Sequence, residues 1–301
     1  MVTRPKNDIV EIFGYAPDDL SQTCRILWDM GACPFIAKSC TKSNHDQSIV
    51  YGTCSVTTAF GDCIICPNRL YENNYAVLRK VADDAFGKDV EFLLFEQYIA
   101  RRDAVHDCIV ALGHNSGKEV KLGSQLSMDW VLARVRAGKL IQYVGVEVQS
   151  IDITNNYRDT WHSYKNLKTT TEIIPKSCHG LNWANVHKRL IPQLIRKGLI
   201  YSRSRFVPSG LYFLLPEIVY SKFEDIIGVD MPLASEQAPD VLTVHTYSLS
   251  QPVPYGQQRH IVSEREVRFK LEEFSKRFIT GVHLPTGEDM DRAVRRVLGV
   301  T

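Results

Sequence analysis

The apolar positions of this chain form short continuous runs and longer helical repeats, which together predict strands alternating with helices. Continuous apolar runs of about four to eight residues are typical of buried strands, and repeats of three and four positions are typical of amphipathic helices. The predicted strands occupy residues 53–60, 90–95, 211–215 and 241–247. The predicted helices occupy residues 73–85, 102–112, 182–195, 216–228, 263–278 and 286–298.

Two of these helices rest on local signals. In the predicted helix over residues 102–112, one face carries Val105, Ile109 and Leu112. This helix ends before Gly113, and glycine often terminates helices. Ser263-Glu-Arg-Glu266 has the pattern of a capping box and predicts that a helix begins there. The apolar face of that helix would carry Val267, Leu271, Phe274 and Phe278.

Three segments lack a clean period. Pro192 should kink or interrupt the helix over residues 182–195. Residues 152–165 are polar and aromatic, and we expect a loop there. Residues 21–69 are rich in cysteine and broken by glycine and proline, so we expect a metal to hold them together.

The middle of the chain has the pattern of a β-hairpin. Residues 125–135 and 140–149 supply the two strands, with a basic turn between them. Because side chains alternate between faces along a strand, Glu147 and Gln149 project together. The hairpin can bring Asp129 opposite Glu147.

This triplet of polar side chains has two interpretations. Two carboxylates and an amide at a strand edge suit a divalent cation that prefers oxygen ligands. Such a cation polarises a phosphoryl oxygen and activates a water. A half-buried hairpin whose acids simply face solvent has the same pattern, so the spacing by itself leaves both interpretations open.

The order of elements predicts an α/β fold in which helices flank a mixed sheet. The composition, 44% apolar and 23% charged, is that of an ordinary globular protein. The formal net charge of +2 is low for a protein that coats nucleic acid, although a sequence-specific binder can concentrate its positive charge in one cleft. We find no apolar run long enough for a bilayer and no signal peptide, so we expect a cytoplasmic protein with no membrane partner.

Cysteines cluster near the start of the chain, where six of the eight fall within 43 residues. Cys33, Cys40, Cys54 and Cys66 could set a tetrahedral site, which by chemistry alone is most often occupied by zinc and less often by iron. Cys63 competes for one of the four positions. The alternative is a set of free buried thiols.

These motifs occur together in one family. The chain resembles the NotI-type type II restriction endonucleases over roughly residues 30 to 220. The shared motifs are Cys33-Pro-Phe35, Cys40, Cys54, Cys66-Pro-Asn-Arg69, Asp129-Trp130, Glu147-Val-Gln149 and Asn185-Val-His-Lys-Arg189. In this chain the gap between the first two cysteines is shorter and Cys63 has no counterpart, which leaves the fourth ligand and the metal open.

The resemblance implies a fold and an active site. The fold would be the PD-(D/E)xK nuclease core, with a metal-binding segment of four cysteines over residues 1–72 and the nuclease core and DNA-recognition elements over residues 73–301. Asp129 and Glu147 would hold Mg²⁺, with the Val148 carbonyl as a further ligand. Gln149 would stand where most of the superfamily carries lysine and would orient the attacking water. The four cysteines would hold iron, with zinc as the alternative.

The resemblance also implies a biological role. A bacterial homodimer would cut double-stranded DNA at a GC-rich palindrome with a GGCC core, CGGCCG being our choice, and leave 5′-phosphate ends. A cognate DNA methyltransferase would be its functional partner. The alternatives are a metal-scaffolded DNA-binding protein without cleavage and a repair nuclease without sequence preference. We expect DNA contacts from Lys42, Lys188, Arg189, Arg203 and Arg205, because guanine edges and phosphates are commonly bound by such side chains.

Overall fold

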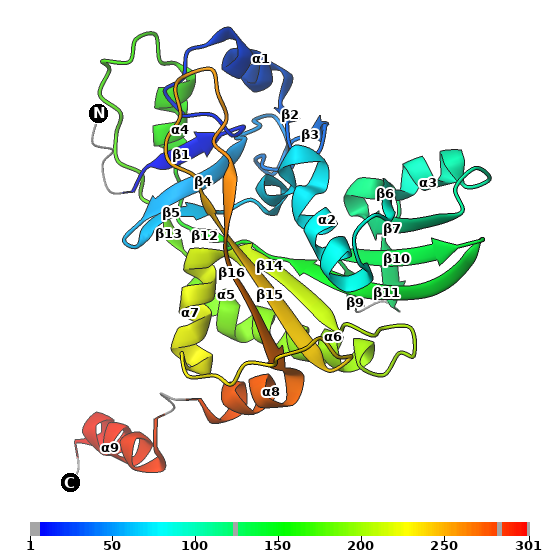
Figure 1. Ribbon diagram of the computed structural model, residues 1–301. Coiled ribbons are helices and arrows are strands. Elements are labelled where there is room, and N and C mark those ends of the chain that lie inside the picture. Colours follow the sequence, from blue (N-terminus) through cyan, green and yellow to red (C-terminus); the bar gives the residue numbers. More distant parts are fainter. Residues whose placement is uncertain (1–6, 123–125, 282–284, 300–301) are drawn as a thin grey trace.

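A seven-stranded mixed sheet forms the centre of the molecule (Figure 1). The computed structural model describes residues 7–122, 126–281 and 285–299. The strand order is β16-β15-β14-β11-β10-β7-β6. The β6–β7, β11–β14 and β14–β15 pairs are parallel, and the other three pairs are antiparallel. The strands are β6 (Glu91–Leu94), β7 (Asp107–Gly113), β10 (Trp130–Arg136), β11 (Lys139–Val148), β14 (Leu211–Pro216), β15 (Val241–Leu249) and β16 (Ile261–Lys270).

Helices cover both faces of this sheet. α2 packs on the face that carries Val144 and Val146, whereas α6, α7 and α8 pack on the face that carries Phe213 and Leu242. The helices are α2 (Glu72–Phe86), α3 (Phe95–Arg101), α6 (Ile191–Tyr201), α7 (Glu217–Ile227), α8 (Leu271–Thr280) and α9 (Gly287–Leu298). Within the described ranges, no helix combines the length and the apolar composition needed to cross a membrane.

The N-terminal segment forms a small antiparallel sheet with the order β1-β4-β5 (Figure 1). Its elements are α1 (Gln22–Met30), β1 (Ile9–Ile12), β2 (Ala32–Cys33), β3 (Lys38–Ser39), β4 (Thr53–Thr58), β5 (Gly61–Ile64) and the 3-10 helix η1 (Pro67–Tyr71). The remaining short elements are the 3-10 helix η2 (His114–Ser116), β8 (Val120–Leu122), β9 (Leu126–Met128), β12 (Ile153–Thr154), α4 (Arg158–Lys165), β13 (Gly180–Leu181), α5 (Trp183–Asn185) and the π-helical segment η3 (Val186–Leu190).

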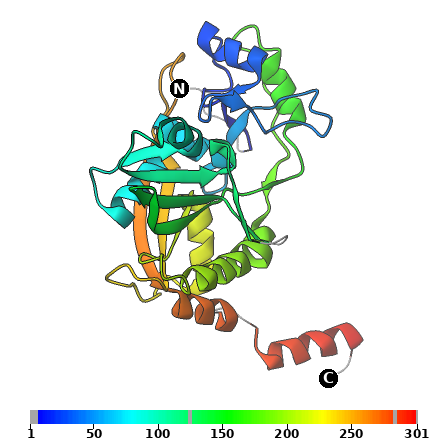
Figure 2. The same ribbon diagram turned by 90° about the vertical axis from the view of Figure 1, so that its right-hand side faces the viewer.

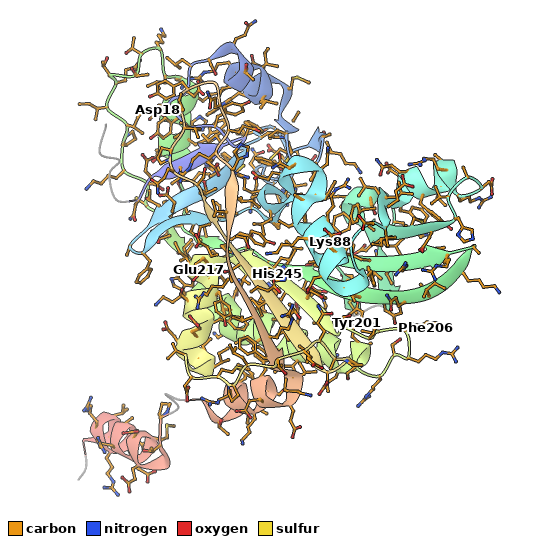
Figure 3. All side chains as sticks on the ribbon, viewed as in Figure 1. Asp18, Lys88, Tyr201, Phe206, Glu217 and His245 are labelled. Atoms are coloured by element: carbon orange, nitrogen blue, oxygen red, sulfur yellow. The ribbon has the colours of Figure 1, made fainter. Side chains whose placement is uncertain are left out.

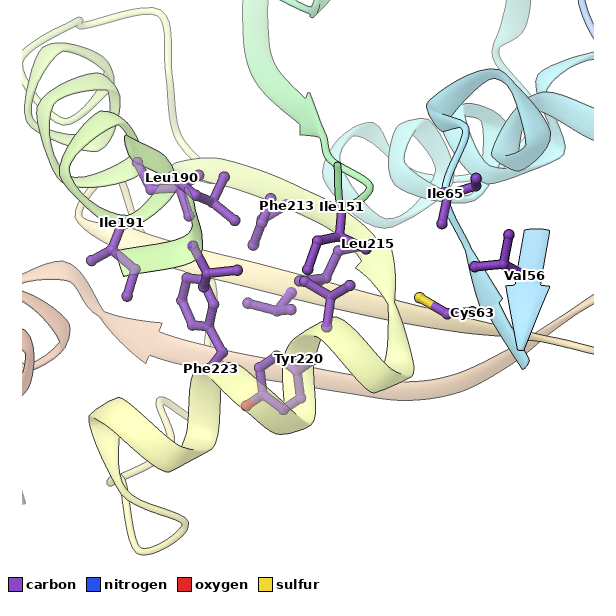
Figure 4. Packing of buried hydrophobic residues seen from close by; sticks show 14 of the residues in the cluster. Val56, Cys63, Ile65, Ile151, Leu190, Ile191, Phe213, Leu215, Tyr220 and Phe223 are labelled. Carbon is purple, nitrogen blue, oxygen red and sulfur yellow. The ribbon is translucent and has the colours of Figure 1, made fainter. Parts of the chain in front are cut away.

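Two apolar clusters join the small sheet to the large one. The first extends from Ile9 in β1 to Phe274 in α8, and Figure 4 shows Cys63 of β5 in the same cluster as residues from β14 and α7. The second extends from Cys33 to Tyr247 and includes most of the inward face of α2. Both clusters combine residues before and after position 72, so the cysteine-rich segment and the main sheet share their cores.

Much of the predicted order is confirmed. The protein is α/β with a mixed sheet flanked by helices. The central hairpin is present as β10 and β11, joined by Ala137 and Gly138, both at positive φ as a two-residue hairpin turn requires. Residue 125, where the first predicted strand begins, lies outside the described residues. The other predicted strands correspond to β4, β6, β14 and β15, and three of the predicted helices to α2, α7 and α9.

The predicted helix over residues 102–112 is wrong. Residues 107–113 form strand β7, which lies between β10 and β6 and is buried on both faces. Ile109 and Ala111 face α2, while Cys108 and Val110 lie in a separate cluster beneath α3. A strand buried on both sides loses its alternation, and its continuous apolar run then also fits a helical period.

The predicted helix start at Ser263 is also wrong. Residues 261–270 form the edge strand β16, and helix α8 begins only at Leu271. Glu266 and Arg268 alternate with Val267 and Phe269 because β16 pairs with β15 along one edge. The acidic residue three positions after a serine therefore belongs to a strand face and not to a capping box.

Two regions expected to lack regular structure contain helices. Residues 158–165 form α4, which buries Trp161 and Tyr164, and residues 22–30 form α1, capped by the Ser21 hydroxyl. The helix around Pro192 contains a π-helical segment, η3, between α5 and α6, and its backbone stays right-handed helical across these junctions, so it is irregular before Pro192 but not split into two pieces. A π turn widens the helix, which lets the chain accommodate a proline that lacks an N–H donor.

A fully buried arginine links the N-terminal segment to the main fold. Arg69 is 0% exposed and pairs with Glu11 of β1 at 3.2 Å and with Glu72 of α2 at 2.6 Å. Its Nη2 donates to the carbonyl of Arg259, and its guanidinium lies 4.6 Å from the centre of the Phe35 ring. One side chain therefore holds four separate segments together.

Replacing Arg69 by methionine should destabilise the protein strongly. The change leaves the Glu11 and Glu72 carboxylates buried without their cation, which costs about 3–5 kcal/mol of unfolding free energy. Urea unfolding measures the loss. Arg101→Met is the control, because its ion pair with Glu91 is exposed and should be worth about 1 kcal/mol or less. Equal losses for the two variants would contradict this role of Arg69.

Candidate active site

The hairpin brings Asp129 to the end of β11. The register pairs Trp130 with Val146, which sets Asp129 beside the last residues of β11. The Val148 N–H donates to Asp129 Oδ2 at 3.0 Å. The predicted approach of Asp129 to Glu147 is therefore present, and one carboxylate oxygen of Asp129 is fixed by the neighbouring backbone.

Glu147 is buried on the face that α6 covers. Its residue exposure is 7%, and its Oε2 accepts a short hydrogen bond from Lys197 Nζ. Its other oxygen, Oε1, is buried and has no hydrogen-bond partner of good geometry among the described residues, although the Asp129 backbone and carboxyl lie close to the Glu147 carboxyl. A buried acceptor left without a donor is costly, so this atom marks a position where a cation or a water fits.

Lys197 is the site residue that the sequence reasoning missed. It lies on α6, 7% exposed, and is the cation nearest to both carboxylates. α6 can approach β11 this closely because Gly145 has no side chain: a Cβ there would lie 2.2 Å from the Tyr201 ring. Arg189, Gln193 and Lys197 recur every four positions, and that polar spacing within an apolar helix was the available signal.

The electrostatics of the site favour added positive charge. Burial raises the pKa of Glu147 to about 8, helped by the Asp129 charge and opposed by Lys197. Crowding by protein atoms also raises the pKa of Asp129, although this residue still presents surface to solvent. The Lys197 ammonium is the cation beside both the Asp129 and the Glu147 carboxyl groups. A third carboxylate, that of Glu119, lies close enough to raise the pKa of Asp129 further.

A divalent cation fits this charge balance. The donor set consists of the Asp129 and Glu147 oxygens, including the unpartnered Oε1, and hard oxygen ligands are those that Mg²⁺ prefers. The carbonyl of Val148 belongs to the same strand end. These residues could hold a metal ion, and they could do so without displacing an existing cation from Oε1.

The Gln149 side chain hydrogen-bonds the backbone of the next residue. Its amide Nε2 donates to the Ser150 carbonyl at 2.8 Å. It lines a small polar cavity of about 130 Å³ together with Asn185, Arg189 and Gln193. Arg189, Gln193 and Lys197 form a polar strip along η3 and α6. The cavity extends this strip from Lys197 towards the end of β11.

Cys33, Cys40, Cys54 and Cys66 lie near one another in the N-terminal segment. Burial raises the pKa of Cys33, Cys40 and Cys54, and a charge on Cys66 would raise each further, which places the four thiols in one electrostatic neighbourhood. Cys63 lies elsewhere: burial raises its pKa to about 12, and its charged neighbour is Asp62.

Burial raises the pKa of all four thiols, and nearby backbone N–H groups offset part of that effect at three of them. After Cys33 and Cys66, the backbone N–H groups two and three residues further along lie near the sulfur and lower its pKa, against the larger effect of burial. The Lys42 N–H donates to Cys40 Sγ at 3.4 Å. The sulfurs are not closed around a point, however, because no three cysteines of the described residues have ligand atoms within 4.8 Å of one another.

A second polar cluster lies on the opposite face of the sheet. Asp84, His245 and Glu266 bring ligand atoms within 4.8 Å of one another, and Figure 3 labels His245, which lies on β15 next to the edge strand β16. Arg268 lies 3.1 Å from Asp84 and 2.7 Å from Glu266, and Lys80 lies 3.6 Å from Glu266. The two cations neutralise the two carboxylates. This cluster therefore has no excess negative charge that would favour a divalent cation.

The five basic residues expected at DNA occupy three places. Arg203 and Arg205 are exposed in the loop after α6. Lys188 and Arg189 are exposed on η3, where Arg189 lines the Gln149 cavity. Lys42 is half-buried, and its charge lowers the pKa of Cys66, so it lies against the cysteines.

Comparison with known proteins returns no match, either to a protein-family model or to a curated protein sequence.

Replacing Glu147 by glutamine should stabilise the protein at alkaline pH. The pKa of Glu147 is higher in the folded protein than in the unfolded chain, so its contribution to stability is lost as the pH rises towards 8. Glutamine cannot ionise, and Lys197 then has Asp129 as its one counterion. We expect a gain of about 2 kcal/mol at pH 8 and almost none at pH 5.

Urea unfolding at both pH values measures this difference. Glu91→Gln is the control, since Glu91 is exposed and should respond little at either pH. A variant that is no more stable than the parent at pH 8 would contradict the buried carboxylate pair.

Proposed function

We propose that this protein is a Mg²⁺-dependent type II restriction endonuclease of the NotI type. The observation that carries the proposal is the pair Asp129 and Glu147 beside Lys197, with Glu147 Oε1 left unpartnered at the end of a buried hairpin. Two acids and a lysine around an open oxygen site are a suitable arrangement for hydrolysis of a phosphodiester bond. The mixed sheet with flanking helices is compatible with a PD-(D/E)xK core.

In this proposal each side chain has one task. Asp129, Glu147 and the Val148 carbonyl would hold Mg²⁺, which when bound neutralises charge on the phosphate and lowers the pKa of a water. Lys197 donates from Nζ towards the attacking water or a nonbridging phosphate oxygen. Gln149 cannot titrate; with its amide N–H on the Ser150 carbonyl, its oxygen is left to accept a hydrogen bond from that water.

The polar strip on α6 and η3 would position the substrate. Arg189 and Lys188 are exposed beside the Gln149 cavity and suit phosphate contacts. Arg203 and Arg205 follow on an exposed loop and suit guanine edges, which arginine contacts with two hydrogen bonds. The expected substrate is a GC-rich palindrome with a GGCC core, probed first as CGGCCG, and the products carry 5′-phosphates.

Cys33, Cys40, Cys54 and Cys66 would hold a structural metal, with iron favoured by the resemblance and zinc as the alternative. The support is chemical: buried thiols remain neutral, whereas backbone donors to three of the sulfurs favour the thiolate that a metal binds. Arg69 follows Cys66 by three residues, so a metal there would reinforce the junction between the N-terminal segment and α2.

The remaining parts of the proposal follow from the substrate. A palindrome has two-fold symmetry, which a homodimer matches. A bacterium that carries such an enzyme in its cytoplasm protects its own DNA with a methyltransferase of the same specificity. These partners are proposed on the resemblance and on the chemistry of a palindromic site.

Digestion of phage DNA with magnesium tests the nuclease. We expect discrete fragments from the parent protein, and a loss of at least about a hundredfold in cleavage for Glu147→Gln and Lys197→Met with DNA binding retained. Lys276→Met is the control, because Lys276 is exposed on α8 away from the site. Intact but shifted DNA would favour the binding protein without cleavage, and a smear would favour a nuclease without sequence preference.

Elemental analysis of the purified protein tests the cysteine site. The parent protein should contain about one iron or zinc per chain, and Cys54→Ser should lose it. Cys63→Ser is the matched control, because Cys63 is equally buried but lies outside the group of four. Metal loss from both variants, or none in the parent, would overturn this assignment.

A further inference from the structure

Helix α9 is amphipathic and has no buried residue. Residues 287–298 contain no buried position, and Met290, Val297 and Leu298 are 65%, 87% and 67% exposed. In both ribbon views α9 stands apart from the sheet and its covering helices (Figures 1 and 2). Its start is well formed, because Thr286 and Asp289 make a complete capping box.

The apolar side chains of α9 lie on one stripe. At about 100° per residue, five apolar positions fall within one side of the helix. These positions are Met290, Ala293, Val294, Val297 and Leu298. An isolated helix of this length is only marginally stable in water, so a stripe of this kind indicates that another surface covers it.

The charges beside the stripe specify the orientation of that surface. Acidic residues come first in α9, at Glu288, Asp289 and Asp291, and arginines follow them, at Arg292, Arg295 and Arg296. A parallel copy in register would set acid against acid and arginine against arginine. An antiparallel copy sets the acidic residues of each helix against the arginines of the other.

The positions along the helix agree with a two-fold axis. In an antiparallel pair the same flank of each helix meets its own copy. Asp291 and Arg295 share one flank and Asp289 and Arg296 share the other, while Met290 and Val297 lie on the stripe between them. The three pairs are Asp291 with Arg295, Asp289 with Arg296, and Met290 with Val297. The midpoint of each pair lies at or within half a residue of position 293, so a single two-fold axis at Ala293 relates all of them.

We propose that α9 pairs with α9 of a second copy of this chain, antiparallel, about a two-fold axis at Ala293. Met290 then packs on the partner's Val297, and Asp291 pairs with the partner's Arg295. The inference rests on the homodimer of the proposed function and supplies its contact. A helix of this length spans about 18 Å and buries less than a standard interface, so the pairing is weak in free solution. Two linked copies on one palindrome would strengthen it through their high effective concentration.

Sedimentation of the full-length protein without DNA or magnesium tests the contact. Across about 1–100 µM protein the parent should shift from monomer to dimer, and Val297→Glu should weaken association at least about tenfold. Val229→Glu is the matched control, because Val229 is also a valine, 84% exposed, but lies in a loop. Equal association of the two variants, or a parent that stays monomeric throughout, would overturn the proposal.

Charge reversal tests the orientation. Asp291→Lys and Arg295→Glu should each associate less than the parent, because each variant sets like charges opposite each other in its own dimer. An equimolar mixture should associate again, since both contacts between the two variants are then complementary. Within each variant helix, positions 291 and 295 carry like charges, and mixing the variants does not change that repulsion. Recovered association can therefore come only from the contact between chains. A mixture no better than either variant alone rules out the antiparallel pair.

These readouts separate the dimer contact from the nuclease. A chain that dimerises through α9 and cuts no DNA overturns the proposed function and leaves this contact in place. A chain that cuts DNA and associates equally well with Val297→Glu overturns this contact alone.

Discussion

The fold depends on one charge that water cannot reach. The guanidinium of Arg69 is enclosed by Glu11, Glu72 and the Arg259 carbonyl, which come from the first strand, from the start of α2 and from the connection between β15 and β16. A buried cation tolerates no missing partner, so these segments must assemble together. The cysteine-rich region consequently behaves as part of the main fold, even though its composition sets it apart.

The same sheet carries one balanced and one unbalanced polar cluster. Around His245, two carboxylates are matched by Arg268 and Lys80, and both ring nitrogens of His245 are buried without a hydrogen-bond partner among the described residues. Around Glu147, one lysine serves two carboxylates and one buried oxygen is left without a donor. The Glu147 cluster has more carboxyl groups than cations, which is why we propose it, and not the His245 cluster, as the cation site.

Local pattern predicted the hairpin and both of its acids, because alternation and a two-residue turn depend on neighbours in sequence. Pattern failed at residues 107–113 and 261–270, where the position of a strand within the sheet decides the outcome: β7 is covered on both faces and β16 lies at an edge. Lys197 was missed for a similar reason. Its meeting with Glu147 depends on how closely α6 approaches β11, and the absence of a side chain at Gly145 matters as much as the lysine itself.

The two-residue turn at Ala137 and Gly138 has a consequence for the order of assembly. Asp129 directly precedes β10 and Glu147 lies in the neighbouring strand β11, so their approach requires closure of only a short loop, whereas Lys197 arrives from 50 residues further along the chain. Local contacts generally form faster than distant ones. The folding chain therefore brings two like charges together before their counterion, and proton uptake by the acid pair can relieve that repulsion until α6 docks.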